Sequence, residues 1–202
     1  MTAAHADSLT DAQRCPWCRG DPLSRLYHDQ EWGVPCREDT TLFEFLILEG
    51  AQAGLSWRTV LHKRDNYRRA LDGFDPYKVA AYDPQKIHLL LQDAGLIRNR
   101  MKLESAVINA NAFLRVRDSY GSFAEFIWSF VEGQPLTGQI RSPADLPVST
   151  PQSEAMARVL KKKGFRFVGG TICYAFMQAT GMVNDHQLDC FRYTACQQLA
   201  SG

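Results

Sequence analysis

Four side chains that could bind a soft metal ion lie near the two ends of this 202-residue chain. Cys15 and His28 are near its beginning, and His186 and Cys190 are near its end. The second pair is four residues apart, a spacing that places both side chains on one face of a helix. Zinc prefers thiolate and neutral imidazole ligands, and two of each complete a tetrahedral structural site. One zinc ion bound by all four would therefore join the two ends of the chain.

Cys18 offers an alternative ligand, because it forms a CxxC sequence with Cys15. This spacing is typical of zinc knuckles and of thiol redox sites. A thioredoxin-like role requires a βαβ context, which the sequence pattern lacks. Cys18 in place of His28 therefore stays open as a second interpretation. The other cysteines have no partner pattern and are interpreted as structural: Cys36, Cys173 and Cys196.

Glu49 is a carboxylate within an apolar segment. On a helix it shares one face with Leu42, Phe45 and Leu46. A carboxylate in such surroundings needs a cation, a hydrogen-bond donor or a bound proton to offset its loss of hydration. An internal ion pair with an arginine is one interpretation, and recognition of a ligand is the other.

Four aromatic side chains lie near these polar residues. Trp17, Tyr27 and Trp32 belong to a polar, turn-rich segment beside the candidate zinc ligands, and Trp57 follows the segment that carries Glu49. Any one aromatic residue most often belongs to the core. Aromatic walls together with one carboxylate would nevertheless form a suitable pocket for a flat, electron-poor or cationic heterocycle.

A basic turn lies between two predicted helices. The segment Asp93–Ile97 contains Gly95, and Arg98, Arg100 and Lys102 follow it directly. Exposed backbone N–H groups at a helix N-terminus, flanked by cations, form a receptor for phosphate. An ordinary helical hairpin with a solvated basic end explains the same pattern equally well.

The elements that must position these residues are predicted to be helices. Helical periodicity recurs along the chain with almost no strand-like alternation, so we predict an all-α protein. The stretch Glu132–Thr150 is rich in proline and is predicted to be a long connection. Capping residues mark the predicted starts of helices. These caps are Thr41, Asp83, Ser122, Thr150 and Thr171.

The composition is ordinary for a soluble globular protein, with 45% hydrophobic residues, 22% charged residues and a net charge of +1. Any basic surface must therefore be local. No segment approaches the roughly 20 apolar residues of a membrane span. Residues 1–13 lack a signal-peptide pattern and are predicted to form a disordered tail. We expect a cytoplasmic protein with reduced thiols and no membrane partner.

Five motifs between Cys15 and Cys190 resemble, in order, those of the bacterial 3-methyladenine DNA glycosylase I family. The motifs are Tyr27–Pro35, Leu48–Trp57, Gln92–Arg98, Val168–Tyr174 and Val183–His186. This resemblance implies a helix-hairpin-helix DNA glycosylase fold with a zinc-binding region that joins the N- and C-terminal segments. Residues 14–40 and 132–202 would form the terminal domain with the zinc site, and residues 41–131 would form the helix-hairpin-helix domain.

The resemblance also implies the roles of individual residues. One structural Zn²⁺ per chain would be held by Cys15, His28, His186 and Cys190. The base pocket would contain Tyr27 and Glu49 as hydrogen-bonding residues, Trp57 as the stacking residue, and Trp17 and Trp32. DNA contacts would come from the probing loop at Gln52, Gly54 and Leu55, and from the hairpin at Gly95, Arg98 and Arg100. Ser24 departs from the family, whose members carry a tyrosine near the pocket.

The implied enzyme is a monofunctional N-glycosyl hydrolase of base-excision repair. It would flip out and remove 3-methyladenine from double-stranded alkylated DNA. We expect a monomer that associates with the nucleoid when acting. The competing interpretation is a non-catalytic, zinc-stabilised DNA-binding protein that uses the hairpin. Glu49 beside Trp57 and Tyr27 favours the enzyme, because a protein that binds only the DNA backbone has no use for such a set.

Overall fold

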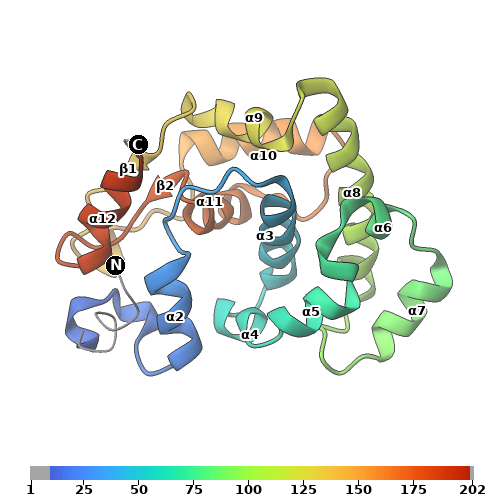
Figure 1. Ribbon diagram of the computed structural model, residues 1–202, viewed down its shortest axis with the longest axis horizontal. Helices are drawn as coiled ribbons and strands as arrows, with labels where there is room; N and C mark the ends of the chain where they lie inside the picture. The colour runs from blue at the N-terminus through green and yellow to red at the C-terminus, as the bar shows by residue number, and fades with distance from the viewer. Residues whose placement is uncertain (1–9, 201–202) are drawn as a thin grey trace. The chain divides into compact units, whose positions relative to one another are not determined.

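The computed structural model describes residues 10–200, and helices dominate this part of the chain (Figure 1). Its α-helices are α2 (Pro22–Gln30), α3 (Asp39–Gln52), α4 (Trp57–Leu61), α5 (Arg64–Ala70), α6 (Pro76–Ala80), α7 (Pro84–Gln92), α8 (Arg100–Tyr120), α9 (Phe123–Trp128), α10 (Pro151–Lys162), α11 (Gly170–Ala179) and α12 (Phe191–Ala200). Short 3-10 helices are η1 (Asp11–Gln13), η2 (Pro16–Cys18), η3 (Asp72–Phe74), η4 (Ser129–Val131) and η5 (Pro143–Asp145). The prediction of an all-α fold is confirmed.

Two very short strands were not predicted. Strand β1 (Leu136–Thr137) lies within the predicted long connection and pairs in parallel with β2 (Val183–Asn184). Two residues per strand are too few to produce a visible alternation of polar and apolar side chains, so the sequence pattern cannot reveal them. None of the helices between residues 10 and 200 is both long enough and apolar enough to cross a membrane.

The chain divides into two compact units. The terminal unit comprises Met1–Cys36, Gln134–Val148 and Met177–Gly202, and the central unit comprises Arg37–Gly133 and Ser149–Phe176. Residues 37–40, 132–133 and 149–176 were predicted to belong to the terminal domain. In the structure they belong to the central unit, where α10 packs against η4. Residues 1–9 of the predicted tail lie outside the described residues, and Asp11–Gln13 form η1 rather than a disordered segment.

Helix α3 forms the centre of the central unit. It packs against α4, α8 and α9, and every residue from Leu42 to Ala51 is buried. The helix begins before the predicted cap Thr41, because the Glu38 carboxylate accepts hydrogen bonds from the backbone N–H groups of Thr40 and Thr41. A helix buried on all sides shows little amphipathic periodicity, which is why its start was misplaced.

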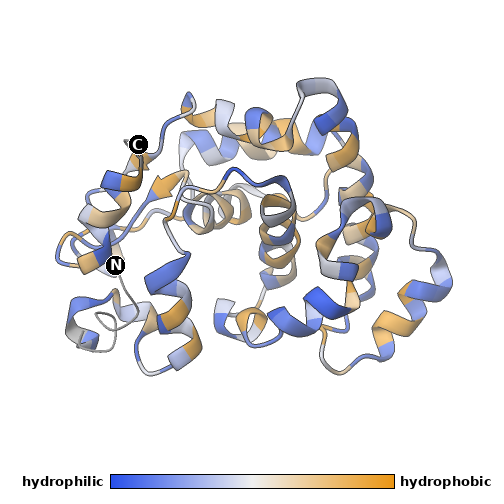
Figure 2. Ribbon diagram, viewed as in Figure 1, coloured by the Kyte–Doolittle hydropathy of each residue, from blue (hydrophilic) through white to orange (hydrophobic). Residues whose placement is uncertain are grey.

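Three of the other predicted helix caps are confirmed. The side chains of Asp83, Ser122 and Thr150 each accept a hydrogen bond from a backbone N–H in the first turn of α7, α9 and α10, respectively. The prediction for Thr171 is wrong, because α11 already begins at Gly170. Hydrophilic residues run along α5 (Figure 2). Two of its arginines, Arg64 and Arg68, contact Glu44 on α3.

Candidate functional site

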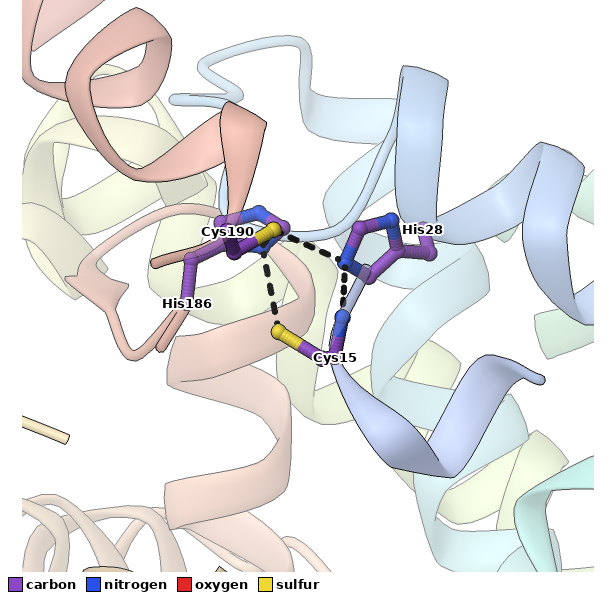
Figure 3. A group of neighbouring side chains, drawn as sticks. All are labelled: Cys15, His28, His186 and Cys190. Atoms are coloured by element: carbon purple, nitrogen blue, oxygen red, sulfur yellow. Dashed lines mark hydrogen bonds between the residues drawn. The ribbon is translucent and has the colours of Figure 1, made fainter. Parts of the chain in front are cut away.

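The four predicted metal ligands converge in the terminal unit (Figure 3). Their ligand atoms all lie within 4.8 Å of one another, and all four side chains are buried. The Cys190 sulfur is 3.4 Å from Nε2 of His28 and 3.5 Å from Nδ1 of His186. The Cys15 sulfur is 3.7 Å from Nδ1 of His186. Two thiols and two imidazoles around one centre are a donor set that fits Zn²⁺.

The predicted reason for the meeting of His186 and Cys190 is wrong. His186 lies in the loop after β2, and Cys190 directly precedes α12, so the two residues do not share a helix. A turn brings them together instead: the Cys190 backbone N–H donates to the carbonyl of Gln187 over 2.9 Å. Four-residue spacing is thus compatible with convergence in a tight loop as well as on a helix.

Both histidines have a second partner that orients the imidazole ring. Nδ1 of His28 lies 2.8 Å from the Asp29 carboxylate, which Arg14 in turn contacts through two guanidinium nitrogens. Nε2 of His186 lies 2.9 Å from the backbone carbonyl of Trp32. These contacts require an N–H on the outward-facing nitrogen, so Nε2 of His28 and Nδ1 of His186 are left as lone-pair donors towards the two sulfurs.

The two cysteine thiols of the cluster favour different protonation states. The neighbouring Cys190 raises the pKa of Cys15, whereas Cys15 and both imidazoles lower the pKa of Cys190. The site therefore favours one thiolate even before a cation is considered.

Cys18 lies outside this cluster. Its thiol donates to the backbone carbonyl of Cys15 over 3.1 Å, and burial raises its pKa to about 12. A buried, protonated thiol that is already donating a hydrogen bond is poorly suited to bind a metal. The geometry therefore favours His28 over Cys18 as the fourth member of the set.

The aromatic residues of the terminal unit pack directly on the four candidate metal ligands. The Trp17 ring meets Trp32 edge to face at a centroid distance of 5.1 Å, and Tyr27 at 6.1 Å. The Trp32 ring meets His186 at 4.6 Å. Tyr27 and Trp32 are buried, whereas 40% of Trp17 is exposed. Of the three, Trp17 therefore presents the most surface to a ligand.

Ser24, the departure from the family pattern, has a local structural role. Its backbone N–H and its hydroxyl both donate to the carboxylate of Asp21, the N-cap of α2. Because α2 carries Tyr27 and His28, this cap fixes the beginning of the helix that supplies both residues.

Glu49 in the central unit is a buried carboxyl group without a partner. Its exposed fraction is 4%, and no residue between 10 and 200 donates a hydrogen bond to it. Burial raises the pKa of Glu49 to about 8. The arginine ion pair that was considered for Glu49 is made instead by Glu44, one and a half turns earlier on α3, which contacts Arg64 and Arg68 on α5.

Glu49 faces a cavity of about 370 Å³ within the central unit. The predicted probing loop lines this cavity through Gln52, Gly54 and Leu55. Trp57 is half-buried at the start of α4 and is not among the lining residues. Three further lining residues come from α11 and were not predicted to belong to a pocket, although two of them lie in the Val168–Tyr174 motif. They are Thr171, Ile172 and Ala175.

The turn between α7 and α8 uses only some of its backbone N–H groups internally. The N–H of Gly95 donates to the Asp93 carboxylate over 2.7 Å, Leu96 donates to the Asp93 carbonyl, and Ile97 donates to the hydroxyl of Tyr67. No residue between 10 and 200 accepts a hydrogen bond from the backbone N–H of Ala94, Arg98 or Arg100. Arg98 and Arg100 are exposed, and Arg100 pairs with Glu104. The phosphate receptor at this turn therefore stays a prediction.

A second turn also has free backbone N–H groups at the start of a helix. It joins α10 to α11, and no residue between 10 and 200 accepts a hydrogen bond from the backbone N–H of Gly169, Gly170 or Thr171. Asn109 on α8 fixes this turn by hydrogen bonds to both the N–H and the carbonyl of Arg166. The Glu154 side chain lies against Gly170. Exposed cations stand at the end of α10 and in the turn: Lys161, Lys162 and Arg166.

Comparison with known proteins places this geometry in a family. Residues 17–193 match the family model described as methyladenine glycosylase. The DNA-3-methyladenine glycosylase 1 of Escherichia coli is 50% identical over 181 residues, which cover 90% of this chain and 97% of the relative. The DNA-3-methyladenine glycosylase of Haemophilus influenzae is 47% identical over 177 residues, covering 88% and 96% of the two chains.

Solved structures of similar proteins superpose closely on this chain. A crystal structure of 3-methyladenine DNA glycosylase I superposes with a TM-score of 0.87 at 53% identity, covering 89% of this chain and 98% of the other. The Staphylococcus aureus enzyme, whose structure concerns 3-methyladenine recognition, superposes with a TM-score of 0.87 at 35% identity, covering 90% and 96% of the two chains. This chain therefore belongs to the methyladenine glycosylase family.

Proposed function

We propose that this chain is a DNA-3-methyladenine glycosylase that flips out 3-methyladenine from double-stranded alkylated DNA and removes it by hydrolysis. The observation that carries this proposal is the buried, unpartnered carboxyl group of Glu49 on a cavity of about 370 Å³. Its close relatives are named as glycosylases of this kind. We further propose that the protein acts as a monomer in the cytoplasm, on nucleoid DNA.

Glu49 suits a cationic base. Methylation at N3 places positive charge on adenine, which weakens the glycosidic bond and makes the base a good leaving group. Because burial raises the pKa of Glu49 to about 8, its side chain is a neutral carboxylic acid at neutral pH when no cation is beside it. A bound cation would favour release of that proton, and the resulting carboxylate would hold the base by an ion pair within a desolvated cavity. A neutral adenine offers no such gain.

The remaining predicted contacts divide between the two units. In the central unit, Leu55 is 44% exposed, as expected for a side chain that enters the duplex as the base leaves it. We assign stacking on the base to Trp57. In the terminal unit, Tyr27 is assigned a hydrogen bond to the base, and Trp17 and Trp32 are assigned apolar contacts.

We propose that the four-residue cluster binds one Zn²⁺ per chain as a structural ion. Four protein ligands leave no open position for water, so this ion would contribute folding free energy rather than chemistry at the base. The support for zinc is the burial of all four ligands and the two oriented imidazoles.

We propose that both the α7–α8 turn and the α10–α11 turn contact the DNA backbone. Free backbone N–H groups at the start of a ten-residue helix, beside Lys161, Lys162 and Arg166, are suited to a phosphate. The free N–H groups at the start of α8, together with Gly95 in the turn and the exposed Arg98 and Arg100, suit a second phosphate.

Release of free base from methylated duplex DNA tests the proposal directly. The purified chain is incubated with DNA treated with a methylating agent, and the released bases are separated by chromatography. We expect 3-methyladenine to appear and unmodified adenine to be absent. If the chain binds DNA but releases no methylated base, it is a non-catalytic DNA-binding protein and the proposed activity is wrong.

A further inference from the structure

One lysine ties the start of α8 to the end of α3. The ammonium group of Lys102 donates to the backbone carbonyl of Ala51 over 2.8 Å and to that of Ala53 over 2.6 Å. Ala51 lies in the last turn of α3 and Ala53 is its C-cap. These carbonyls have no partner within the helix itself, so Lys102 satisfies two groups that the helix end leaves free.

The position of Lys102 is unfavourable for its own helix. It is the third residue of α8, where the side chain of the N-cap Asn99 accepts a hydrogen bond from its backbone N–H. A cation in the first turn is opposed by the helix dipole, and partial burial lowers the pKa of Lys102. At the C-terminus of α3 the same charge is favourable, since the dipole there presents its negative end. The charge of Lys102 therefore stabilises the end of α3 rather than the start of α8.

The segment that Lys102 holds leads directly into the probing loop (Gln52–Leu55). Within this loop, Gly54 has a φ of +76°, and the N–H of Leu55 donates to the carbonyl of Gln52. Ser56 follows as the N-cap of α4 and fixes the far end. The near end is fixed by Lys102, so the loop is a short, tight turn between two anchors. Glu49 lies one turn before the near anchor, on the same helix and the same cavity.

We propose that Lys102 is a positioning residue that holds the probing loop and the last turn of α3 in the geometry needed to extrude the base beside Glu49. This proposal rests on the proposed glycosylase function. Lys102 touches neither the cavity nor the reacting atoms, and acts only through the backbone of Ala51 and Ala53. A small displacement of groups that position a substrate can lower a rate by about 100-fold.

The test compares Lys102→Met with Lys102→Arg and with a matched control, Lys63→Met. Met keeps the length of the side chain and removes its donors, whereas Arg keeps the charge and the donors. Lys63 makes the same kind of contact in the same unit, to the carbonyl of Ala94 over 2.8 Å, but its target is the α7–α8 turn. Lys102→Gln serves as a further neutral variant if the Met variant does not fold.

Three measurements are made on each folded variant. They are the single-turnover rate of 3-methyladenine release, the affinity for undamaged duplex, and the fluorescence of 2-aminopurine placed next to a tetrahydrofuran abasic-site analogue. For Lys102→Met we expect the rate to fall about 10- to 100-fold, the 2-aminopurine signal to fall with it, and the undamaged-duplex affinity to stay unchanged. Lys102→Arg should recover most of the rate and signal, and Lys63→Met should retain both.

The outcomes separate this proposal from the one on which it rests. If the parent protein releases no 3-methyladenine, the proposed function fails. If the parent is active and Lys102→Met has the parent's rate and signal, the role of Lys102 is wrong. It is also wrong if Lys63→Met loses as much rate as Lys102→Met, because the effect would then reflect general stability of the unit.

Discussion

The backbone carbonyl of Trp32 accepts a hydrogen bond from Nε2 of His186, over 2.9 Å. The residue assigned to an aromatic wall thus orients a candidate metal ligand from the other end of the chain. Gly33 continues this contact: it has a φ of +76°, and a Cβ added there would lie 3.0 Å from the His186 ring. The backbone of Trp32–Gly33 therefore packs closely against the His186 ring. A change in the conformation of this segment should move the ring.

Gly33→Ala should weaken the metal site. A side chain at this φ is strained by about 1–2 kcal/mol, and the new methyl group would also press on the ring of His186. Gly20→Ala is a matched control, since Gly20 has the same φ of +76° and nothing within 4 Å of an added Cβ. We expect both variants to lose thermal stability and only Gly33→Ala to lose zinc faster to a chelator. Equal rates of zinc loss would contradict the link between Gly33 and the site.

Cys190→Ser and Cys18→Ser should behave differently. Elemental analysis of the parent should find one zinc per chain. Cys190→Ser should lose the ion and several kcal/mol of stability, because structural metal binding contributes directly to folding free energy. Cys18→Ser should keep the ion, since the Cys18 thiol lies outside the cluster. An equal loss of zinc from both variants would move the ligand assignment to the CxxC sequence.

The four candidate metal ligands show what the sequence alone could predict. Residue type pointed to Cys15, His186 and Cys190 but left His28 and Cys18 as alternatives, and only the family resemblance favoured His28. The sequence could not show how His186 and Cys190 come together. A four-residue spacing fits a helix, but it also fits the tight turn before Cys190 that the structure contains. Helix caps such as Asp83 were predictable because they depend on the three or four residues that follow.

The turns illustrate what sequence cannot decide. Whether the N–H of Ile97 is free depends on Tyr67, which is 30 residues away. The shape of the α10–α11 turn depends on Asn109, which is 57 residues from its partner Arg166. Both contacts are tertiary, so local composition could not show which N–H groups of either turn stay free. The role of Thr171 in the cavity was missed for the same reason, since its pattern also fits a helix cap.

The two basic turns can be tested by the salt dependence of DNA binding. We expect the double variant Lys161→Glu, Lys162→Glu to bind undamaged duplex more weakly and with a shallower salt dependence, each lost phosphate contact reducing the slope by about 1. The double variant Arg98→Glu, Arg100→Glu should behave in the same way. Fluorescence anisotropy across a series of salt concentrations gives both quantities. Unchanged affinity and slope for either pair would show that its turn makes no phosphate contact.

Glu49→Gln should change how stability depends on pH. Burial raises the pKa of Glu49 from its ordinary value of 4.5 to about 8. Between these values the folded state keeps a proton that the unfolded state has lost, so the parent's stability falls as the pH rises. The substitution removes this fall, and the variant should be more stable than the parent above pH 8, by up to about 5 kcal/mol. Urea unfolding over this pH range measures the difference. The exposed Glu104→Gln is the control and should follow the parent's curve.

The same substitution should reduce activity while it increases stability at high pH. A glutamine at this position would keep the shape of the side chain and lose the negative charge that a cationic base requires, so excision of 3-methyladenine should fall by roughly 10- to 1,000-fold. Affinity for undamaged duplex should remain, since no DNA contact is assigned to this buried group.

Trp57→Ala should weaken base binding by about 1–3 kcal/mol through lost stacking. Neither variant should release unmodified adenine, whose neutral ring neither gains from the carboxylate nor leaves easily. If both variants excise 3-methyladenine at the parent's rate, the cavity beside Glu49 is not where the base binds.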